Sequence, residues 1–341
     1  MKIRARIQAQ HHPVKLISAV RRSGHFFLNW RSRQLPQDHN VLYNMVDRMY
    51  IGHIPDIGPS ALTGVGVTMP IIMCISAFAA LAAMGGAPQA SILMGKGDKD
   101  SAEKVLGNCT FMLTVISLLL TALFLGFGRP ILLMFGASEK TILYAWNYMK
   151  IYVCGTFFVQ MALGLNAFIN AQGYAKTGMI TVAIGALCNI ILDPIFIFGL
   201  HLDVRGAALA TILSQGISCI WILRFLTGTQ DPADTAPQPA PAEEIYPAMP
   251  ALGLAPFIMQ FTESALSISF NTSLLKYGGD TAVGAMTILS SVMQFSMLPL
   301  QGLTQARSRS SALTMEQKIS TGEKSVSPAS ALGSLLFHLA L

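Results

Sequence analysis

Length, composition and charge together indicate a protein that spans a membrane. Of the 341 residues, 52% are hydrophobic and only 12% are charged, with a mean hydropathy of +0.51, whereas a soluble domain carries about 25% charged residues. The net charge of +6 does not indicate nucleic-acid binding, because eight Lys or Arg residues against one Asp lie in residues 1–40.

Apolar runs follow one another along the chain, and several reach the roughly 20 residues that span a bilayer as a helix. None alternates in hydropathy with period two over about 10 residues, which excludes barrel strands. Gly- and Pro-containing turns separate the runs, among them Gly128, Arg129 and Pro130. The sequence therefore predicts an all-α polytopic membrane protein with seven or eight spanning segments, at residues 41–51 (short), 61–84, 106–127, 142–168, 177–198, 207–225, 251–275 and 282–303.

Composition also divides the chain into regions. A stretch rich in Pro, Ala and acidic residues follows the sixth segment, has nothing to bury, and therefore indicates a linker. The predicted regions are a basic N-terminal segment (1–40), an N-terminal helical bundle with a partial first helix (41–226), the linker (227–250), the first two helices of a C-terminal bundle (251–305) and a polar tail (306–341). The basic N-terminal segment favours a cytoplasmic N-terminus, although Lys and Arg divide almost evenly between the short loops.

Three acidic residues lie within apolar segments, where each costs at least about 2.5–3.5 kcal/mol if it faces lipid. These residues, Asp47, Asp193 and Glu263, are therefore expected to face a polar interior. Asp47 has an alternative interpretation as an ion pair with Arg48 at the membrane interface. We treat all three as candidate functional residues.

Asp193 has the most informative surroundings. Asn189 lies four residues earlier, on the same face of the helix, and Pro194 has no N–H to bond the carbonyl of Ile190. A carboxylate, an amide and a free carbonyl form a set of oxygen ligands suited to Na⁺ or to a proton site. The alternative is a structural kink in which Asp193 pairs with Arg205.

Other polar residues within the apolar segments are candidates for a substrate cavity. Glu263 shares one helix face with Gln260 and Asn271. Gln160 and Asn166 extend the candidate cavity. In each case the alternative is packing, because amides and hydroxyls in membrane helices also hydrogen-bond neighbouring helices.

Five segments of the chain, taken together, resemble the multidrug and toxic compound extrusion (MATE) family. They are residues 43–53, 164–173, 189–194, 206–211 and 302–305. The resemblance implies two six-helix bundles around a central cavity. It also implies a cation or proton site formed by Asp47, Asn189, Asp193 and Thr211, and a seventh-helix carboxylate at Glu263.

The resemblance implies a secondary multidrug efflux antiporter of the plasma membrane, not an enzyme. It would export amphipathic or cationic compounds in exchange for Na⁺ or H⁺. A cation or proton bound at Asp193 would neutralise the carboxylate and weaken its hold on a cationic drug. No cofactor is expected beyond the coupling ion. The expected partners are small-molecule drugs or toxic cations and the lipid bilayer, with no nucleic acid. A lipid-linked sugar flippase and a non-transporting membrane scaffold are the alternative functions.

Both ends depart from the family pattern. Residues 14–40 carry too many charges to supply the first half of a spanning helix, and a polar run replaces further helices after Gln305. We therefore expect a fragment that is truncated or frameshifted at both ends and inactive in this form. The alternative is a natural short form whose second bundle is completed by a partner chain.

Overall fold

The computed structural model describes residues 46–228 and 248–319, with side chains for residues 253–294 of the latter range. The chain divides into two compact units, one of residues 39–293 and one that combines residues 1–38 with 294–341. In the second unit, residues 294–319 are helical. The described residues form helices and no strands, which confirms the all-α class. The predicted N-terminal segment (1–40), most of the linker and residues 320–341 of the tail lie outside the described residues.

The first described helical turns, residues 46–52, carry Asp47 and precede two long apolar helices. The first of these, α2 (Gly58–Gly95), begins with Pro59, whose missing N–H costs little in a first turn. The second, α3 (Lys99–Met134), begins after Asp98, whose carboxylate caps the helix.

The predicted turn at Gly128 to Pro130 is wrong, because these residues lie inside α3. Within a membrane, neighbouring elements can satisfy the backbone groups that Pro leaves unpaired, so Pro and Gly are tolerated in spanning helices. Gly128 also allows close packing, since a Cβ at this position would lie 2.6 Å from the Trp146 ring. The helix therefore continues to Met134.

The predicted segment 142–168 consists of two helices. They are α4 (Ile142–Cys154) and α5 (Thr156–Ala171), bent by 58° at Gly155. A Cβ on Gly155 would lie 2.5 Å from the side chain of Ile212, so only glycine permits this close approach. The break thus lies at a close contact between α7 and the α4–α5 pair.

The proline effect predicted near Asp193 is present in the structure. Helix α6 (Ala175–Pro194) ends at the proline and continues as a π-helical turn, η1 (Ile195–Gly199). The N–H of Leu200 bonds the carbonyl of Ile195 at 2.9 Å, the five-residue spacing of a π turn. Proline removes one α-helical bond and the wider turn accommodates the loss.

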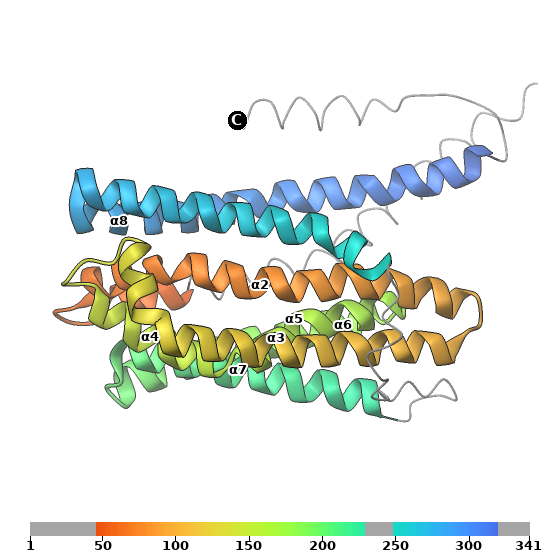
Figure 1. Cartoon of the computed structure of the whole chain (residues 1–341), viewed down its shortest axis with the longest axis horizontal. Helices are drawn as coiled ribbons and strands as arrows, with labels where there is room; N and C mark the ends of the chain where they lie inside the picture. The colour runs from red at the N-terminus through yellow and green to blue at the C-terminus, as the bar shows by residue number, and fades with distance from the viewer. Residues whose placement is uncertain (1–45, 229–247, 320–341) are drawn as a thin grey trace, which may run out of the picture. The chain divides into compact units, whose positions relative to one another are not determined.

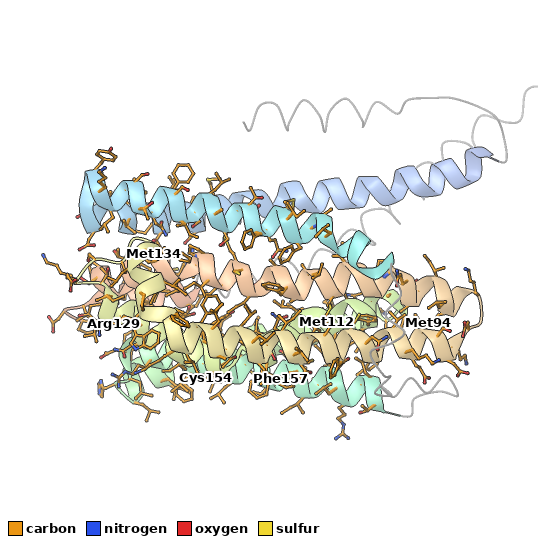
Figure 2. All side chains as sticks on the ribbon, in the orientation of Figure 1. Met94, Met112, Arg129, Met134, Cys154 and Phe157 are labelled. Carbon is orange, nitrogen blue, oxygen red and sulfur yellow. The ribbon has the colours of Figure 1, made fainter. Side chains whose placement is uncertain are left out.

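Helix α7 (Asp203–Thr227) completes the first bundle. It packs against α4, α5 and α6, while α2 packs against α3, α4 and α5. Figure 1 shows α2 and α3 running side by side. Figure 2 draws the side chains of α2 to α7, and large apolar ones such as Leu118 and Phe127 are 63% exposed. An exposed apolar surface of this kind suits contact with lipid.

In the described residues, α2, α3, α6 with η1, and α7 are each long and apolar enough to cross a membrane. The bent pair α4 and α5 adds a fifth span if it crosses as one unit. The sequence predicted seven or eight spans, and the two segments placed in α8 are not among those that meet this test.

Helix α8 (Ala248–Ile319) contains a sharp reversal at Gly279, where φ is 63° and ψ is −165°. This reversal agrees with the predicted turn between the last two segments. We call residues 248–278 the first arm and residues 280–293 the second arm of the α8 hairpin. Both arms belong to the same compact unit as α2 to α7.

Candidate cation-binding site

Asp193 and Asn189 form the centre of the candidate site, on the last two turns of α6. Their four-residue spacing places them on one face, and Nδ2 of Asn189 donates to Oδ1 of Asp193 at 3.1 Å. Both side chains are buried, with Asp193 at 0% and Asn189 at 1% exposure. The other oxygens, Oδ2 of Asp193 and Oδ1 of Asn189, have no hydrogen-bond partner.

Thr211 joins this pair from α7. Its Oγ1 lies 3.5 Å from Nδ2 of Asn189 and donates to the carbonyl of Ala207 at 3.0 Å. Because its proton is used within its own helix, the hydroxyl oxygen presents lone pairs to the neighbours. The structure therefore brings together three of the four residues for which the resemblance implied a cation site.

The fourth residue, Asp47, approaches from the helical turns before α2. It is 6% exposed, and its Oδ1 has no hydrogen-bond partner. It lies close enough to Asp193 for the two carboxylates to act on each other electrostatically. Two neighbouring carboxylates oppose each other's negative charge and so favour a bound cation or proton.

The alternative pairings raised by the sequence can be compared with these positions. The charge that acts on Asp193 comes from Asp47, whereas Arg205 is exposed. Arg48 interacts electrostatically with Asp47, but both are buried, and the guanidinium donates to Ser291 and Met69. Neither acidic residue therefore lies in the setting of a surface ion pair.

Tyr148 of α4 belongs to this cluster, and the sequence analysis missed it. Its hydroxyl lies near Thr211, and it interacts electrostatically with Asp47 and Asp193. Its ring stacks on Tyr152 one turn later, with centroids 6.1 Å apart. The available signal was this pair of tyrosines within an apolar segment, since membrane tyrosines are otherwise enriched at the interfaces.

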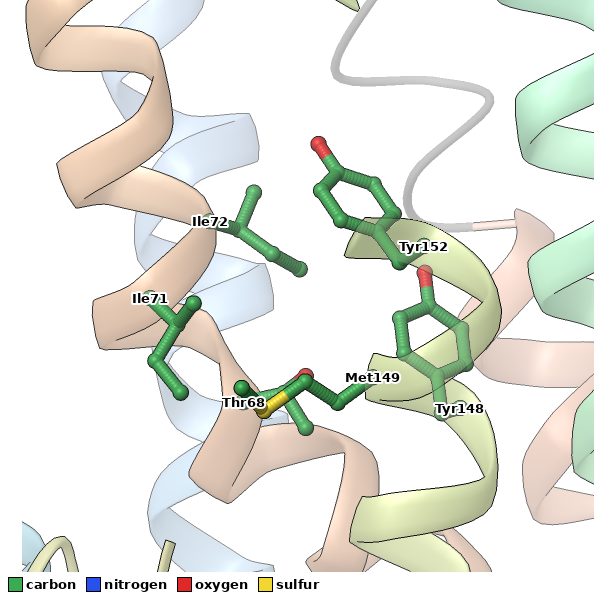
Figure 3. Close-up of a pocket in the computed structure, with 6 residues that line it drawn as sticks. All are labelled: Thr68, Ile71, Ile72, Tyr148, Met149 and Tyr152. Carbon is green, nitrogen blue, oxygen red and sulfur yellow. The ribbon is translucent and has the colours of Figure 1, made fainter. Parts of the chain in front are cut away.

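A small space adjoins Tyr148 between α2 and α4, and Figure 3 shows the side chains that line it. It has no room for even a water molecule, whereas a site for a drug-sized ligand measures roughly 300–1,000 Å³. It is lined by Thr68, Ile71, Ile72, Tyr148, Met149 and Tyr152. The space is therefore a gap in the packing and not a site for a drug-sized ligand.

The predicted cavity residues of α8 lie in different settings. Glu263 is exposed, Gln260 is half-buried, and Asn271 is buried with its Nδ2 unpartnered. Ser264, next to Glu263, donates to the carbonyl of Pro70 on α2 at 2.7 Å, which is the packing role considered as the alternative. A shared substrate cavity for these residues stays a prediction.

The predicted cavity residues of α5 lie inside the first bundle. Gln160 is fully buried, and its Nε2 donates to the carbonyl of Ile75 at 2.9 Å. Asn166 is half-buried, and its Oδ1 has no partner. Gln160 therefore links α5 to α2, as the packing alternative predicts, while its Oε1 remains unpartnered.

The cluster as a whole offers acceptors without matching donors. Oδ1 of Asp47, Oδ2 of Asp193 and Oδ1 of Asn189 are buried oxygens with no hydrogen-bond partner. A buried unpaired carboxylate is unfavourable unless a counter-charge or proton satisfies it. Carboxylate, amide and hydroxyl oxygens are suitable ligands for Na⁺ or acceptors for a proton.

Comparisons with known proteins show which proteins the chain is similar to. The MatE family model matches residues 39–195. The multidrug export protein MepA of Staphylococcus haemolyticus is 29% identical over 271 residues, which are 78% of this chain and 58% of MepA. MepA of Staphylococcus aureus (strain NCTC 8325) is 26% identical over 267 residues, with the same shares.

Solved structures share the fold. One is an inward-facing multidrug resistance MATE transporter of the MOP superfamily, with TM-score 0.73, 26% identity, and coverage of 78% of this chain and 60% of that one. Another is the MATE multidrug transporter DinF-BH in complex with R6G, with TM-score 0.73, 29% identity, and coverage of 81% and 63%. The chain thus spans 58% of the length of the MepA proteins. Its apolar helices make the chain a multi-pass membrane protein, and over residues 39–195 it is similar to the MATE family, whose members are transporters and not enzymes.

Proposed function

We propose that the chain takes part in secondary multidrug efflux, in which Na⁺ or H⁺ binds at the Asp47, Asn189, Asp193 and Thr211 cluster and amphipathic or cationic compounds are exported. One observation carries the proposal: buried carboxylate and amide oxygens of the helical bundle have no hydrogen-bond partner, and a cation or proton would satisfy them. The names of the relatives, multidrug export proteins, support the drug side of the proposal.

The coupling follows from competition for negative charge. A cation or proton that neutralises Asp193 or Asp47 removes the attraction for a cationic drug nearby, and a bound drug opposes binding of the ion to the same extent. Rocking of one helical group against another then exposes the site to alternate sides of the membrane. In this proposal the chain's own contribution is the ion site.

Localisation in the plasma membrane with a cytoplasmic N-terminus is part of the proposal. The eight basic residues of the first 40 support this orientation. Lys96 and Lys99 lie at the turn between α2 and α3, which is on the cytoplasmic side in this topology.

Ion binding can be tested on the purified chain by thermal unfolding in detergent. A ligand that binds only the folded state stabilises it by about 2.7 kcal/mol at 100 times its Kd. Separate titrations with Na⁺ at constant pH and with protons at constant ionic strength identify the ion. We expect Asp193→Asn to remove the stabilisation and Asp100→Asn, an exposed carboxylate on α3, to retain it.

Transport can be tested in liposomes that contain the chain and a fluorescent cationic dye. Dye movement that an imposed Na⁺ or H⁺ gradient drives in the wild type and in Asp100→Asn, but not in Asp193→Asn, would support the proposal and would show that the chain is active in this form, against the expectation from the sequence. Dye movement that is independent of both gradients, or unaltered in Asp193→Asn, contradicts the assignment.

A further inference from the structure

Arg48 is a buried cation whose contacts the proposed ion site does not explain. It is 8% exposed, and its guanidinium donates to Oγ of Ser291 on the second arm of the α8 hairpin and, at 2.9 Å, to Sδ of Met69 on α2. Both acceptors are neutral. A buried arginine normally pairs with a carboxylate, so its use of two neutral acceptors needs a reason.

The second arm meets α2 along one regular stripe. Gly284, Thr287 and Ser291 are spaced by three and four residues, which places them on one helix face. A Cβ on Gly284 would lie 2.5 Å from Oγ1 of Thr63, and a Cβ on Gly66 would lie 1.9 Å from Oγ1 of Thr287. The two helices are therefore in close contact beside the Arg48 contact.

The position of Ser291 follows from this packing. Its own hydroxyl proton goes to the carbonyl of Thr287 at 2.9 Å, one turn earlier. The hydroxyl oxygen is thus left to accept from Arg48. The guanidinium stays at Ser291 only while the second arm packs on α2, because Thr287 and Ser291 belong to the same arm.

Asp47 is the charged neighbour that Arg48 does not satisfy. The two residues interact electrostatically, while the guanidinium donates to Ser291 and Met69. Oδ1 of Asp47 has no hydrogen-bond partner, and the carboxylate acts electrostatically on Asp193 of the candidate ion site. If the guanidinium left Ser291, Asp47 would be the nearby carboxylate able to receive it.

We propose that Arg48 is a positioning residue of the ion site, held away from Asp47 by Ser291, so that packing of the α8 hairpin on α2 sets the site's affinity for its cation. While the hairpin is packed, Asp47 is available to the ion. When the hairpin separates from α2, Arg48 pairs with Asp47 and competes with the ion. This inference rests on the proposed function, since it assigns a control element to the same site.

The test measures ion affinity in purified variants by the thermal titration described above, with the ion that stabilises the wild type. We expect Ser291→Ala to weaken affinity about tenfold, the change that corresponds to 1.4 kcal/mol. Ser291→Thr keeps the hydroxyl and should retain the wild-type affinity. Ser269→Ala is the matched control, because Ser269 also donates within α8, to the carbonyl of Ala265 at 3.0 Å, but is exposed.

A second variant separates positioning from a merely structural role. In Ser291→Ala combined with Arg48→Gln, the competing charge is gone, so affinity should recover toward the wild type. A structural role predicts the opposite, because two packing contacts are then lost. Unfolding without ion is measured for each variant to show that it folds.

The outcomes distinguish this inference from the proposed function. Wild-type affinity in Ser291→Ala, equal weakening in Ser269→Ala, or no recovery in the double variant overturns the role of Arg48. If any of these results occurs while Asp193→Asn still abolishes ion binding, the role of Arg48 is wrong but the proposed ion site is retained. If the wild type responds to neither Na⁺ nor protons, both proposals fail.

Discussion

Nδ2 of Asn189 donates to Oδ1 of Asp193 across one turn of α6, at 3.1 Å, in a position where neither side chain reaches solvent. The bond occupies one carboxylate oxygen and fixes the orientation of the other. Oδ2 of Asp193 and Oδ1 of Asn189 are left without partners. The same contact thus orients the carboxylate and leaves an oxygen free for an ion.

The contact should appear as an energetic coupling. We expect a double-mutant cycle of Asn189→Ala and Asp193→Ala to give a coupling free energy of about 0.5–3 kcal/mol, as for other contacting residues in one network. The measurement is the free energy of unfolding in detergent. Thr227, exposed near the end of α7 and bonded to the carbonyl of Leu223, is the control, and Thr227→Ala should add to Asn189→Ala within about 0.5 kcal/mol. Additivity of the first pair would show that the bond does not stabilise the site.

Thr211 tests whether the hydroxyl on α7 belongs to the ion site. Thr211→Val keeps the shape but removes the oxygen that lies 3.5 Å from Nδ2 of Asn189 and contacts Tyr148. A neutral hydrogen bond contributes about 0.5–1.5 kcal/mol, so ion affinity should fall about two- to tenfold. Thr211→Ser retains the hydroxyl and should bind as the wild type does. Equal losses in both variants would point to packing of the methyl group instead.

The sequence predicts best those features that depend on local spacing. The pairing of Asn189 and Asp193 follows from a four-residue interval on a helix, and the distortion after Pro194 follows from its missing N–H. Gly278 and Asp280, on either side of Gly279, indicate the turn between the last two predicted segments. In each case the residues that determine the structure lie within one or two turns of one another.

Contacts between distant segments were not predictable from spacing. Tyr148 reaches Thr211, and Arg48 reaches Ser291, which lies 243 residues away. The break at Gly155 depends on the side chain of Ile212, and nothing near Gly155 in the sequence indicates this. These features arise only when α4, α7 and α8 pack against the other helices, so they cannot be predicted from the hydropathy of neighbouring residues.

Asp98, outside the membrane-spanning segments, should make the start of α3 sensitive to acid. Hydrogen bonds from the side chain and backbone N–H of Ser101, and then the charge of Lys104, lower the pKa of Asp98 below its ordinary value of 3.8. Because the folded-state pKa is lowered, the stabilisation is present above the ordinary value and is lost as the pH falls through the lowered one. Hydrogen exchange of the first turn of α3 should therefore accelerate at acid pH beyond its intrinsic pH dependence.

Asp98→Asn provides the control for this effect, since asparagine is also a good cap but does not titrate in this range. The variant should show the same first-turn exchange at neutral pH and no added acid dependence. If the wild type and Asp98→Asn respond to acid alike, another group is responsible.

Alanine should destabilise at Gly66, in the stripe between α2 and the second arm of α8, and should stabilise at Gly126, outside the stripe. Gly66→Ala places a methyl group against Thr287, and overpacking of this kind costs about 1–3 kcal/mol. Gly126→Ala, on the exposed face of α3, meets no atom within 4 Å and should stabilise by about 0.4–1 kcal/mol, because alanine restricts the unfolded chain. The measurement is thermal unfolding in detergent.

Thr287→Ala should restore part of the stability lost in Gly66→Ala, since it removes the two Thr287 atoms closest to the added methyl group. A Gly66→Ala variant as stable as the wild type would mean that the second arm does not pack on α2 through this stripe, and Arg48 would then have no fixed contact with Ser291.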